Sequence, residues 1–222
     1  MFPIALAPPS FKAAIFDFDG TLALTDDLWR SVDEAFFAKR GIPYDAEMAL
    51  ALSTRGFADG AQWCIGRYGL SDTVEEICAE WTEMGRALYR TEVRLRAGVE
   101  EYLRYLRGEG IPLALATVND RRVVASIAHI DVLSLFDAVV CGREGGRSKT
   151  HPDIYYKAAS ELGAGPAGCI VFEDAPGAIR TALRAGFPTC AVCASDSPTR
   201  EFGLLCSEAD TSILGWEGLL TP

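Results

Sequence analysis

Positive charge is scarce in this sequence. The chain has 21 lysine and arginine residues against 31 aspartate and glutamate residues, which gives a formal net charge of -10. This excess of negative charge argues against nucleic acids and anionic membrane surfaces as partners, because both carry charge of the same sign. A small anionic substrate is still compatible with it, since a cation held in one site can reverse the local field.

Long apolar runs are also missing. No stretch reaches the roughly 18 residues that a membrane-spanning helix requires. The first ten residues are partly apolar, but they lack a basic start and contain prolines, so they do not resemble a signal peptide. We therefore expect a cytoplasmic protein without a membrane partner, present as a monomer or a weak dimer.

The cysteines do not form a disulfide pattern. There are seven of them, an odd number, and most lie within apolar runs, as is typical of reduced cytosolic thiols. Cys190 and Cys193 have the spacing of a metal or redox pair, but no second cysteine pair or histidine partner follows them. We expect both side chains to pack in the core.

Two kinds of sequence segment alternate along the chain. Short, nearly continuous apolar runs predict buried parallel strands, and amphipathic patterns between them predict helices. The strands are expected at 13–18, 112–117, 137–141, 168–174 and 187–193, and the helices at 99–109, 121–129, 153–162 and 175–185. This alternation indicates an α/β fold with a doubly wound, Rossmann-like parallel sheet.

A long insertion interrupts the alternation. Residues 25–97 contain only helix-like patterns, and they are too many for a crossover loop. Acidic residues open the first of these helices and Gly41 ends it, while Ser71 is the candidate N-cap of a later one. We expect a helical cap at 25–97 and a catalytic core formed by 1–24 and 98–222.

Polar residues follow each of the first four predicted strands, at the carboxyl ends where open α/β sheets bind ligands. They are Asp17 and Asp19, Thr117 and Asn119, Lys149, and Glu173 and Asp174. Asp17 and Asp19 lie on one face of a strand. Like charges about 4 Å apart repel by roughly 4 kcal/mol at an effective dielectric near 20. Positive charge is therefore expected beside them.

The charges of this crevice favour a bound cation. Lys149 offsets one of four carboxylates, and a divalent cation would offset two more. Mg²⁺ is the expected ion because no cysteine or histidine stands at these positions. A phosphoryl group requires the same combination of metal and lysine, so the pattern predicts phosphoryl transfer.

Phosphoryl transfer gives each polar group a role. We expect Asp17 to attack phosphorus and form an aspartyl phosphate. Asp19 is expected to protonate the leaving oxygen and then deprotonate the attacking water, and repulsion should favour its protonated form. Gly20 permits a tight turn that exposes amides to the phosphate, and Thr117 and Asn119 offer further hydrogen bonds.

The segments DFDGTL, LATVN, SKTHPDIYYKAA and FEDAPGAIRTALRAG resemble, in this order, the four motifs of the haloacid dehalogenase superfamily. With the end of the strand that precedes the first segment, the motif positions span residues 15–186, and the insertion lies where the β-phosphoglucomutase-like phosphatase branch of subfamily I places its cap. The resemblance implies a nucleophile at Asp17, an acid/base at Asp19, phosphoryl binding at Thr117 and charge at Lys149. It also implies Mg²⁺ ligands at Asp17, the Asp19 carbonyl, Asp174 and, through water, Glu173.

The expected activity is Mg²⁺-dependent hydrolysis of a small phosphorylated metabolite such as a sugar phosphate, with a cap that excludes water and selects the substrate. A phosphosugar mutase of the β-phosphoglucomutase type is one alternative, although Trp29 stands where those mutases carry a histidine. A non-catalytic module that binds a phosphorylated ligand is another, although the nucleophile and the lysine are both present. Arg55, in the loop 53–60, is a candidate contact for a second phosphate or a carboxylate.

Two further features of the sequence have structural interpretations. Leu24 and Thr25 stand where this branch usually has aspartate and serine, so the turn after the first motif is expected to form different hydrogen bonds. The aromatic residues are expected to form the cap core in preference to a platform for substrate. They are Trp29, Phe57, Trp63 and Trp81.

Overall fold

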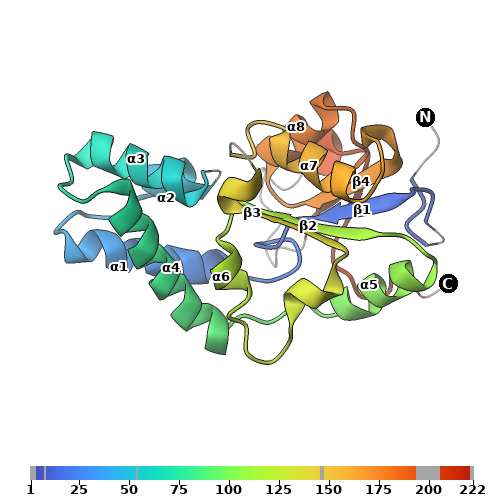
Figure 1. Ribbon diagram of the computed structural model, residues 1–222, viewed down its shortest axis with the longest axis horizontal. Helices are drawn as coiled ribbons and strands as arrows, with labels where there is room; N and C mark the ends of the chain where they lie inside the picture. Colours follow the sequence, from blue (N-terminus) through green and yellow to red (C-terminus); the bar gives the residue numbers. More distant parts are fainter. Residues whose placement is uncertain (1–3, 8, 54, 146–147, 194–205, 221–222) are drawn as a thin grey trace.

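The protein folds around one parallel sheet of six strands. The computed structural model describes residues 4–7, 9–53, 55–145, 148–193 and 206–220 (Figure 1). The strand order is β3-β2-β1-β4-β5-β6, and every neighbouring pair is parallel. The strands are β1 (Ala13–Phe16), β2 (Leu113–Thr117), β3 (Ala138–Cys141), β4 (Cys169–Glu173), β5 (Thr189–Val192) and β6 (Thr211–Ile213).

Both faces of the sheet are covered by helices, which explains the continuous apolar runs of the strands. Side chains of β1 alternate: Ile15 packs with Ile154 of α7 (Asp153–Glu161), whereas Phe16 packs in the same cluster as Tyr102 of α5 (Val99–Gly108). Helix α8 (Pro176–Arg184) lies beside α7 (Figure 1). The expected doubly wound α/β fold is confirmed.

Five helices lie between β1 and β2 in the chain, and the first four of them form a group beside the sheet (Figure 1). These four are α1 (Asp26–Lys39), α2 (Ala46–Ser53), α3 (Phe57–Tyr68) and α4 (Val74–Thr91). Their apolar faces meet in a separate cluster that includes Phe36, Met48 and Trp81. We refer to α1–α4 as the cap; the domain boundaries at 25–97 and at 1–24 with 98–222 stay a prediction.

Two details of the predicted helices were wrong. Helix α4 is capped by Thr73 and not by Ser71, because Thr73 and Glu76 form a reciprocal capping box. Helix α6 (Arg121–Val124) is much shorter than the predicted 121–129. The N–H and the hydroxyl of Ser126 both donate to the Val123 carbonyl, at 3.0 and 2.6 Å, and this tight turn closes the helix.

The strand order reverses between β1 and β4. Crossovers from β1 run to β2 on one side, whereas β4 and β5 are added on the other. In open α/β sheets a crevice forms outside the carboxyl ends of the strands at such a reversal. Asp17 directly follows β1, and Glu173 ends β4, so the topology brings these two segments together.

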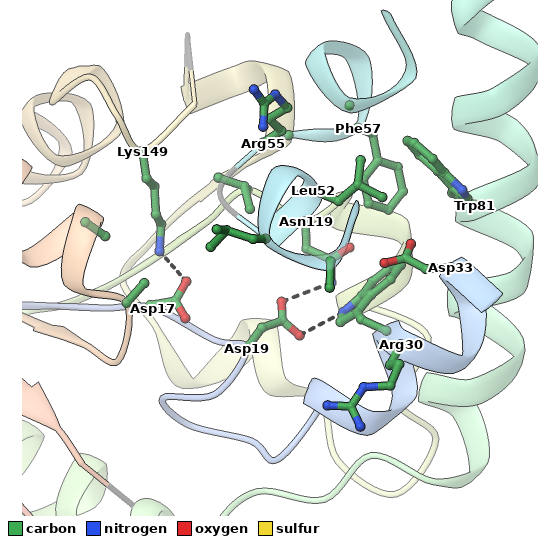
Figure 2. A pocket seen from close by; sticks show the side chains of 18 of the residues that line it. Asp17, Asp19, Arg30, Asp33, Leu52, Arg55, Phe57, Trp81, Asn119 and Lys149 are labelled. Atoms are coloured by element: carbon green, nitrogen blue, oxygen red, sulfur yellow. Dashed lines mark hydrogen bonds and ion pairs between the residues drawn. The ribbon is translucent and has the colours of Figure 1, made fainter. Parts of the chain in front are cut away.

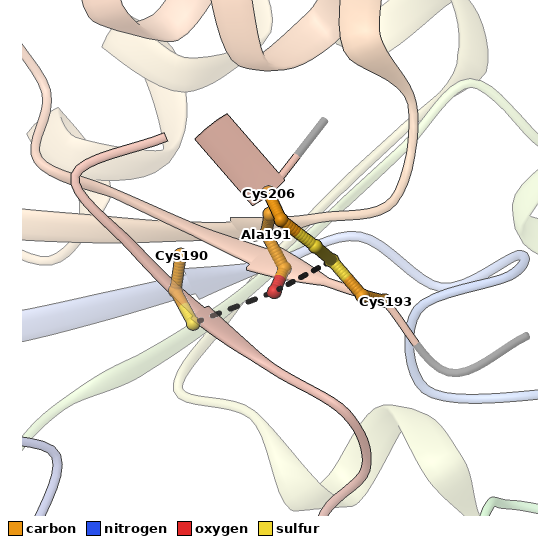
Figure 3. Close-up of a disulfide and its surroundings, with 4 residues drawn as sticks. All are labelled: Cys190, Ala191, Cys193 and Cys206. Carbon is orange, nitrogen blue, oxygen red and sulfur yellow. Dashed lines mark hydrogen bonds between the residues drawn. A yellow bond between two sulfur atoms is a disulfide. The ribbon is translucent and has the colours of Figure 1, made fainter. Parts of the chain in front are cut away.

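A disulfide joins Cys193 to Cys206, with Cα atoms 6.8 Å apart (Figure 3). The expectation of reduced thiols without a disulfide was wrong for this pair, because the chain brings residue 206 back to the end of β5 after a separation of 13 residues. Cys190 is free and fully buried, as expected, and its thiol faces the Ala191 carbonyl at 3.9 Å.

None of the helices in the described part of the chain is both long and apolar enough to cross a membrane.

Candidate active site

The turn after β1 places the first carboxylate. Asp17 is buried, and its N–H donates to the Phe172 carbonyl of β4 at 3.0 Å. Gly20 follows with φ of 80°, and a Cβ at this position would overlap the carboxylate of Asp174. The glycine of the first motif is therefore required both by the left-handed backbone and by the close approach of a second carboxylate.

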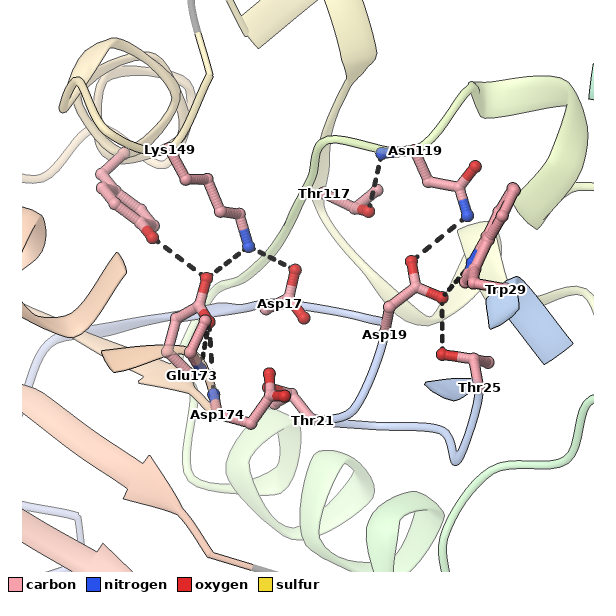
Figure 4. Close-up of polar contacts among 12 residues, drawn as sticks. Asp17, Asp19, Thr21, Thr25, Trp29, Thr117, Asn119, Lys149, Glu173 and Asp174 are labelled. Carbon is pink, nitrogen blue, oxygen red and sulfur yellow. Dashed lines mark hydrogen bonds and ion pairs between the residues drawn. The ribbon is translucent and has the colours of Figure 1, made fainter. Parts of the chain in front are cut away.

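Lys149 joins two of the carboxylates. Its ammonium group forms ion pairs with Asp17 Oδ1 and Glu173 Oε1, and all three side chains are buried (Figure 4). The hydroxyl of Tyr155 also donates to Glu173 Oε1, at 3.0 Å. Burial by itself lowers the pKa of Lys149, but the Asp17 and Glu173 carboxylates raise it above its usual value. Lys149 is therefore a fixed positive charge in this site.

Asp17 has a perturbed carboxyl group. Burial raises its pKa well above the ordinary value, Lys149 opposes this shift, and Glu173, Asp174 and Asp19 add to it. The group therefore needs more positive charge beside it to stay ionised, as a nucleophile must.

Three carboxylates meet at the crevice and fit a hard cation. Oxygens of Asp17, Glu173 and Asp174 lie within 4.8 Å of one another. Thr21 fixes one of them, since its hydroxyl donates to Asp174 Oδ1 at 2.9 Å. Three negative charges face one lysine, and the available donors are oxygens, the ligands that Mg²⁺ prefers. The three carboxylates repel one another, and a divalent cation bound between them would relieve this repulsion.

Asp19 is held by residues from both the core and the cap (Figure 4). Its Oδ1 accepts hydrogen bonds from the Thr25 hydroxyl at 2.8 Å, from the Trp29 indole at 3.1 Å and from the Tyr89 hydroxyl. Its Oδ2 accepts a bond from the Asn119 amide at 3.2 Å. These contacts turn the carboxylate toward the cap. The expectation that Asp19 is protonated stays a prediction.

The end of β2 supplies Thr117 and Asn119. Thr117 is fully buried, and its hydroxyl accepts a hydrogen bond from the Asn119 N–H at 3.1 Å. The Asn119 amide also donates to the Tyr89 hydroxyl at 3.0 Å. The Asn119 side chain lines the cavity described below, whereas Thr117 is not part of its lining. Contact of either side chain with a phosphoryl group stays a prediction.

A cavity of about 480 Å³ connects this crevice with the cap (Figure 2). Asp17, Asp19, Asn119, Lys149, Glu173 and Asp174 line it from the core. Trp29, Asp33, Tyr44, Arg55, Phe57 and Trp81 line it from the cap.

The cap aromatics have two roles. Trp29, Phe57 and Trp81 pack in the cap cluster, as expected, and they also line the cavity. Trp63 packs against the same cluster and is absent from the cavity lining. Arg55 lines the cavity, where its side chain donates to the Ala51 carbonyl.

Sequence reasoning missed several residues of the site. Tyr89 contacts Asp19 from a distant helix, and no local spacing marks it. Tyr155 lies within the third quoted segment, but its contact with Glu173 was not predicted. Thr21 lies within the first motif, where its hydroxyl, one residue after Gly20, was an available signal. Thr25 was expected to change the turn, and it does so by donating to Asp19.

Comparisons with known proteins find relatives of the chain. A family model for haloacid dehalogenase-like hydrolases matches residues 11–186. Validoxylamine A 7'-phosphate phosphatase from Streptomyces hygroscopicus subsp. limoneus is 29% identical over 177 residues, which cover 79% of this chain and 83% of that protein. Fructose-1-phosphate phosphatase YqaB from Escherichia coli (strain K12) is 28% identical over 177 residues, with 79% and 93% covered. The structure of CbbY from Rhodobacter sphaeroides in complex with phosphate aligns with a TM-score of 0.78 at 27% identity, covering 94% of this chain and 96% of that chain.

Proposed function

Because the chain belongs to the haloacid dehalogenase-like hydrolase family, we propose that it is a Mg²⁺-dependent phosphomonoesterase that works through an aspartyl phosphate on Asp17. The observation that carries this proposal is the meeting of Asp17, Lys149, Glu173 and Asp174 in one cavity. The family resemblance seen in the four sequence motifs is confirmed.

The comparisons favour a phosphatase over the mutase alternative, because several of the relatives are named as phosphatases of sugar phosphates and other small metabolites. Trp29 agrees with this, since its indole donates to Asp19 at the position where the mutases of this branch carry a histidine. A module that only binds phosphorylated ligands is also disfavoured, since the nucleophile and the buried lysine are both in place.

The proposed reaction has two displacements at phosphorus. A carboxylate oxygen of Asp17 attacks the phosphorus of the ester, the bond to the leaving oxygen breaks, and Asp19 gives that oxygen a proton. Water then attacks the aspartyl phosphate and loses a proton to Asp19. The bond between phosphorus and Asp17 breaks, which releases inorganic phosphate and restores both side chains.

The other residues bind and orient the phosphoryl group. Lys149 contributes a fixed positive charge, and Thr117 and Asn119 offer hydrogen bonds to its oxygens. Gly20 keeps the turn open to the phosphate. Arg55 lines the cavity from the cap, but the contact with a second phosphate or a carboxylate that the sequence suggested for it is not part of this proposal, because its side chain donates to the Ala51 carbonyl.

We propose Asp17, Asp174 and the main-chain carbonyl of Asp19 as the Mg²⁺ ligands, with Glu173 acting through water. A bound Mg²⁺ would add the positive charge that the buried carboxylates lack and would polarise the phosphoryl oxygens.

We also propose a small phosphorylated metabolite, such as a sugar phosphate, as the substrate. The cavity volume of about 480 Å³ is suited to a ligand of this size. A cytoplasmic location and a monomeric or weakly dimeric state complete the proposal.

A phosphate-release assay tests this function. Purified enzyme is incubated with a panel of phosphorylated metabolites, with Mg²⁺ and with a chelator. We expect release from at least one small ester with Mg²⁺ and its loss on chelation. Asp17→Asn should abolish release, whereas Asp27→Asn, at an exposed position of α1, should leave it unchanged. Release that is indifferent to the chelator or survives Asp17→Asn would refute the proposal.

A further inference from the structure

The cap contributes one carboxylate to the cavity whose charge is not neutralised. Asp33 lies on α1, one turn after Trp29, so both side chains share a face of that helix. It lines the same cavity as Asp17, and Figure 2 shows it at the end opposite Lys149. Within the described ranges, Asp33 has no ion pair with a lysine or arginine.

Tyr44 forms one hydrogen bond with the Asp33 carboxylate, which can accept more than one. The Tyr44 hydroxyl donates to Asp33 Oδ2 at 3.0 Å, and both residues line the cavity. A carboxylate has about four sites that accept hydrogen bonds, so a single neutral donor leaves most of its capacity unused. A ligand that enters the cavity can donate to the remaining sites.

Aromatic side chains line the cavity on the same side as Asp33. The ring of Phe57 meets those of Trp29 and Trp81 edge-on, with centroids 5.5 and 5.8 Å apart. Burial raises the pKa of Asp33 to about 6, although Tyr44 donates to it, and the neighbouring Glu34 carboxylate adds a smaller upward shift. An ionised group in such a poorly solvated place gains most from a ligand that brings hydrogen-bond donors or positive charge.

The two arginines of the cavity lining have partners other than Asp33. Arg55 donates to the Ala51 carbonyl, and its guanidinium lies 5.7 Å from the ring centroid of Trp63, which does not line the cavity. Arg30 is exposed and pairs with Asp27 at 3.4 Å. The far end of the cavity therefore keeps its negative charge, while Lys149 makes the phosphate end positive.

We propose that Asp33, held by Tyr44, selects the substrate by accepting hydrogen bonds from the leaving group. The substrate class is then a monophosphate ester whose far end carries an ammonium group or hydroxyls and no second anionic group. Apolar carbon atoms of this leaving group pack against Trp29 and Phe57. The inference rests on the proposed phosphatase function and adds the class of ester to it.

Synthetic esters of matched length test this assignment. Phosphate monoesters of amino alcohols, diols and hydroxy acids are compared at several equal chain lengths, so that only the charge at the far end differs. At the length that spans the cavity, we expect kcat/KM to be about tenfold or more higher for the amine than for the carboxylate, a difference of about 1.4 kcal/mol. In Asp33→Asn this ratio should fall about tenfold, mainly through KM.

The control is Glu34→Gln, which removes an exposed carboxylate from the next position of α1. It should leave the ratio within about twofold of the wild-type value. The assignment is wrong if Asp33→Asn keeps the wild-type ratio, if Glu34→Gln lowers it equally, or if the wild-type enzyme prefers the carboxylate.

Binding gives a readout that needs no turnover. Aminoalkyl and carboxyalkyl phosphonates, which cannot be hydrolysed, are titrated into the wild-type enzyme and Asp33→Asn by calorimetry. The wild-type enzyme should bind the amine more tightly, and the variant should lose this preference. If discrimination is present but no ester is hydrolysed, the proposed phosphatase function fails and the role of Asp33 stands; equal binding of both phosphonates overturns that role.

Discussion

The ammonium group of Lys149 is buried between two buried carboxylates. Lys149 pairs with Asp17 and Glu173, and all three side chains are almost fully enclosed. Removing one partner of a buried ion pair leaves an uncompensated charge, which costs about 3–5 kcal/mol. The same lysine that we assign to phosphoryl binding therefore also stabilises the folded core.

Lys149→Met should lose activity and stability together. In the absence of Mg²⁺ we expect its free energy of unfolding, measured by urea titration, to fall by about 3 kcal/mol or more. Lys12→Met is the control, because Lys12 is exposed. Equal urea midpoints for the two variants would show that Lys149 does not neutralise the carboxylates.

Asp33→Asn should stabilise the protein at neutral pH. The pKa of Asp33 is raised from 3.8 to about 6, chiefly by burial. The folded protein therefore keeps this proton to a higher pH than the unfolded chain, and stability is lost as the pH rises from about 4 through 6. We expect a gain of about 1 kcal/mol for Asp33→Asn at pH 7.5, and a smaller gain at pH 4. A pH-independent difference in thermal unfolding would contradict this explanation.

The residues of the family motifs could be predicted from sequence because their positions relative to strand ends are local. Asp17, Thr117 and Asp174 each lie at or just after an apolar run. Asp33 and Tyr89 could not be assigned in this way. Their roles depend on which face of a cap helix meets the core, and that is decided by packing between distant segments.

At the scale of elements, the strands and long helices form where the hydrophobic pattern of the sequence predicts them. The ends of short elements depend on local hydrogen bonds of side chains. Strands β1 to β5 lie within the predicted runs because both faces are buried. The three-residue strand β6 was not predicted, since its sequence, Thr211–Ile213, is short and largely polar. Helix α6 ends early where the Ser126 hydroxyl donates to the Val123 carbonyl, and the hydrophobic periodicity of the sequence does not reveal this hydrogen bond.

The capping box of α4 offers a test at this scale. Thr73→Ala should lower the free energy of unfolding by about 1 kcal/mol, because the first turn loses a hydrogen-bond acceptor. Ser71→Ala, at the position favoured by the sequence pattern, should have no measurable effect. Urea unfolding of the two variants compares them directly, and a larger loss for Ser71→Ala would contradict the observed cap.

At the scale of the whole molecule, the sheet and the cap together form the cavity that we propose as the active site. The reversal of strand order gathers the carboxylates, and the cap helices close a cavity above them. Asp19 joins the two parts, because its carboxylate accepts bonds from Trp29 and Tyr89 of the cap. The residues proposed for substrate selection and those proposed for chemistry therefore line neighbouring parts of one cavity.

Metal binding should be visible in the stability of the whole protein. Mg²⁺ that binds the folded state alone raises the melting temperature as its concentration rises. We expect such a rise for the wild-type protein and its loss in Asp174→Asn, measured by calorimetry over a Mg²⁺ titration. An equal rise in the variant would place the ion elsewhere.

The stereochemistry at phosphorus tests the central claim most directly. A phosphate ester made chiral with oxygen isotopes is hydrolysed by the enzyme, and the configuration of the released phosphate is determined. Two in-line displacements, the first by Asp17 and the second by water, invert the configuration twice. We predict overall retention; inversion would mean that water attacks the ester directly and would contradict an aspartyl phosphate intermediate.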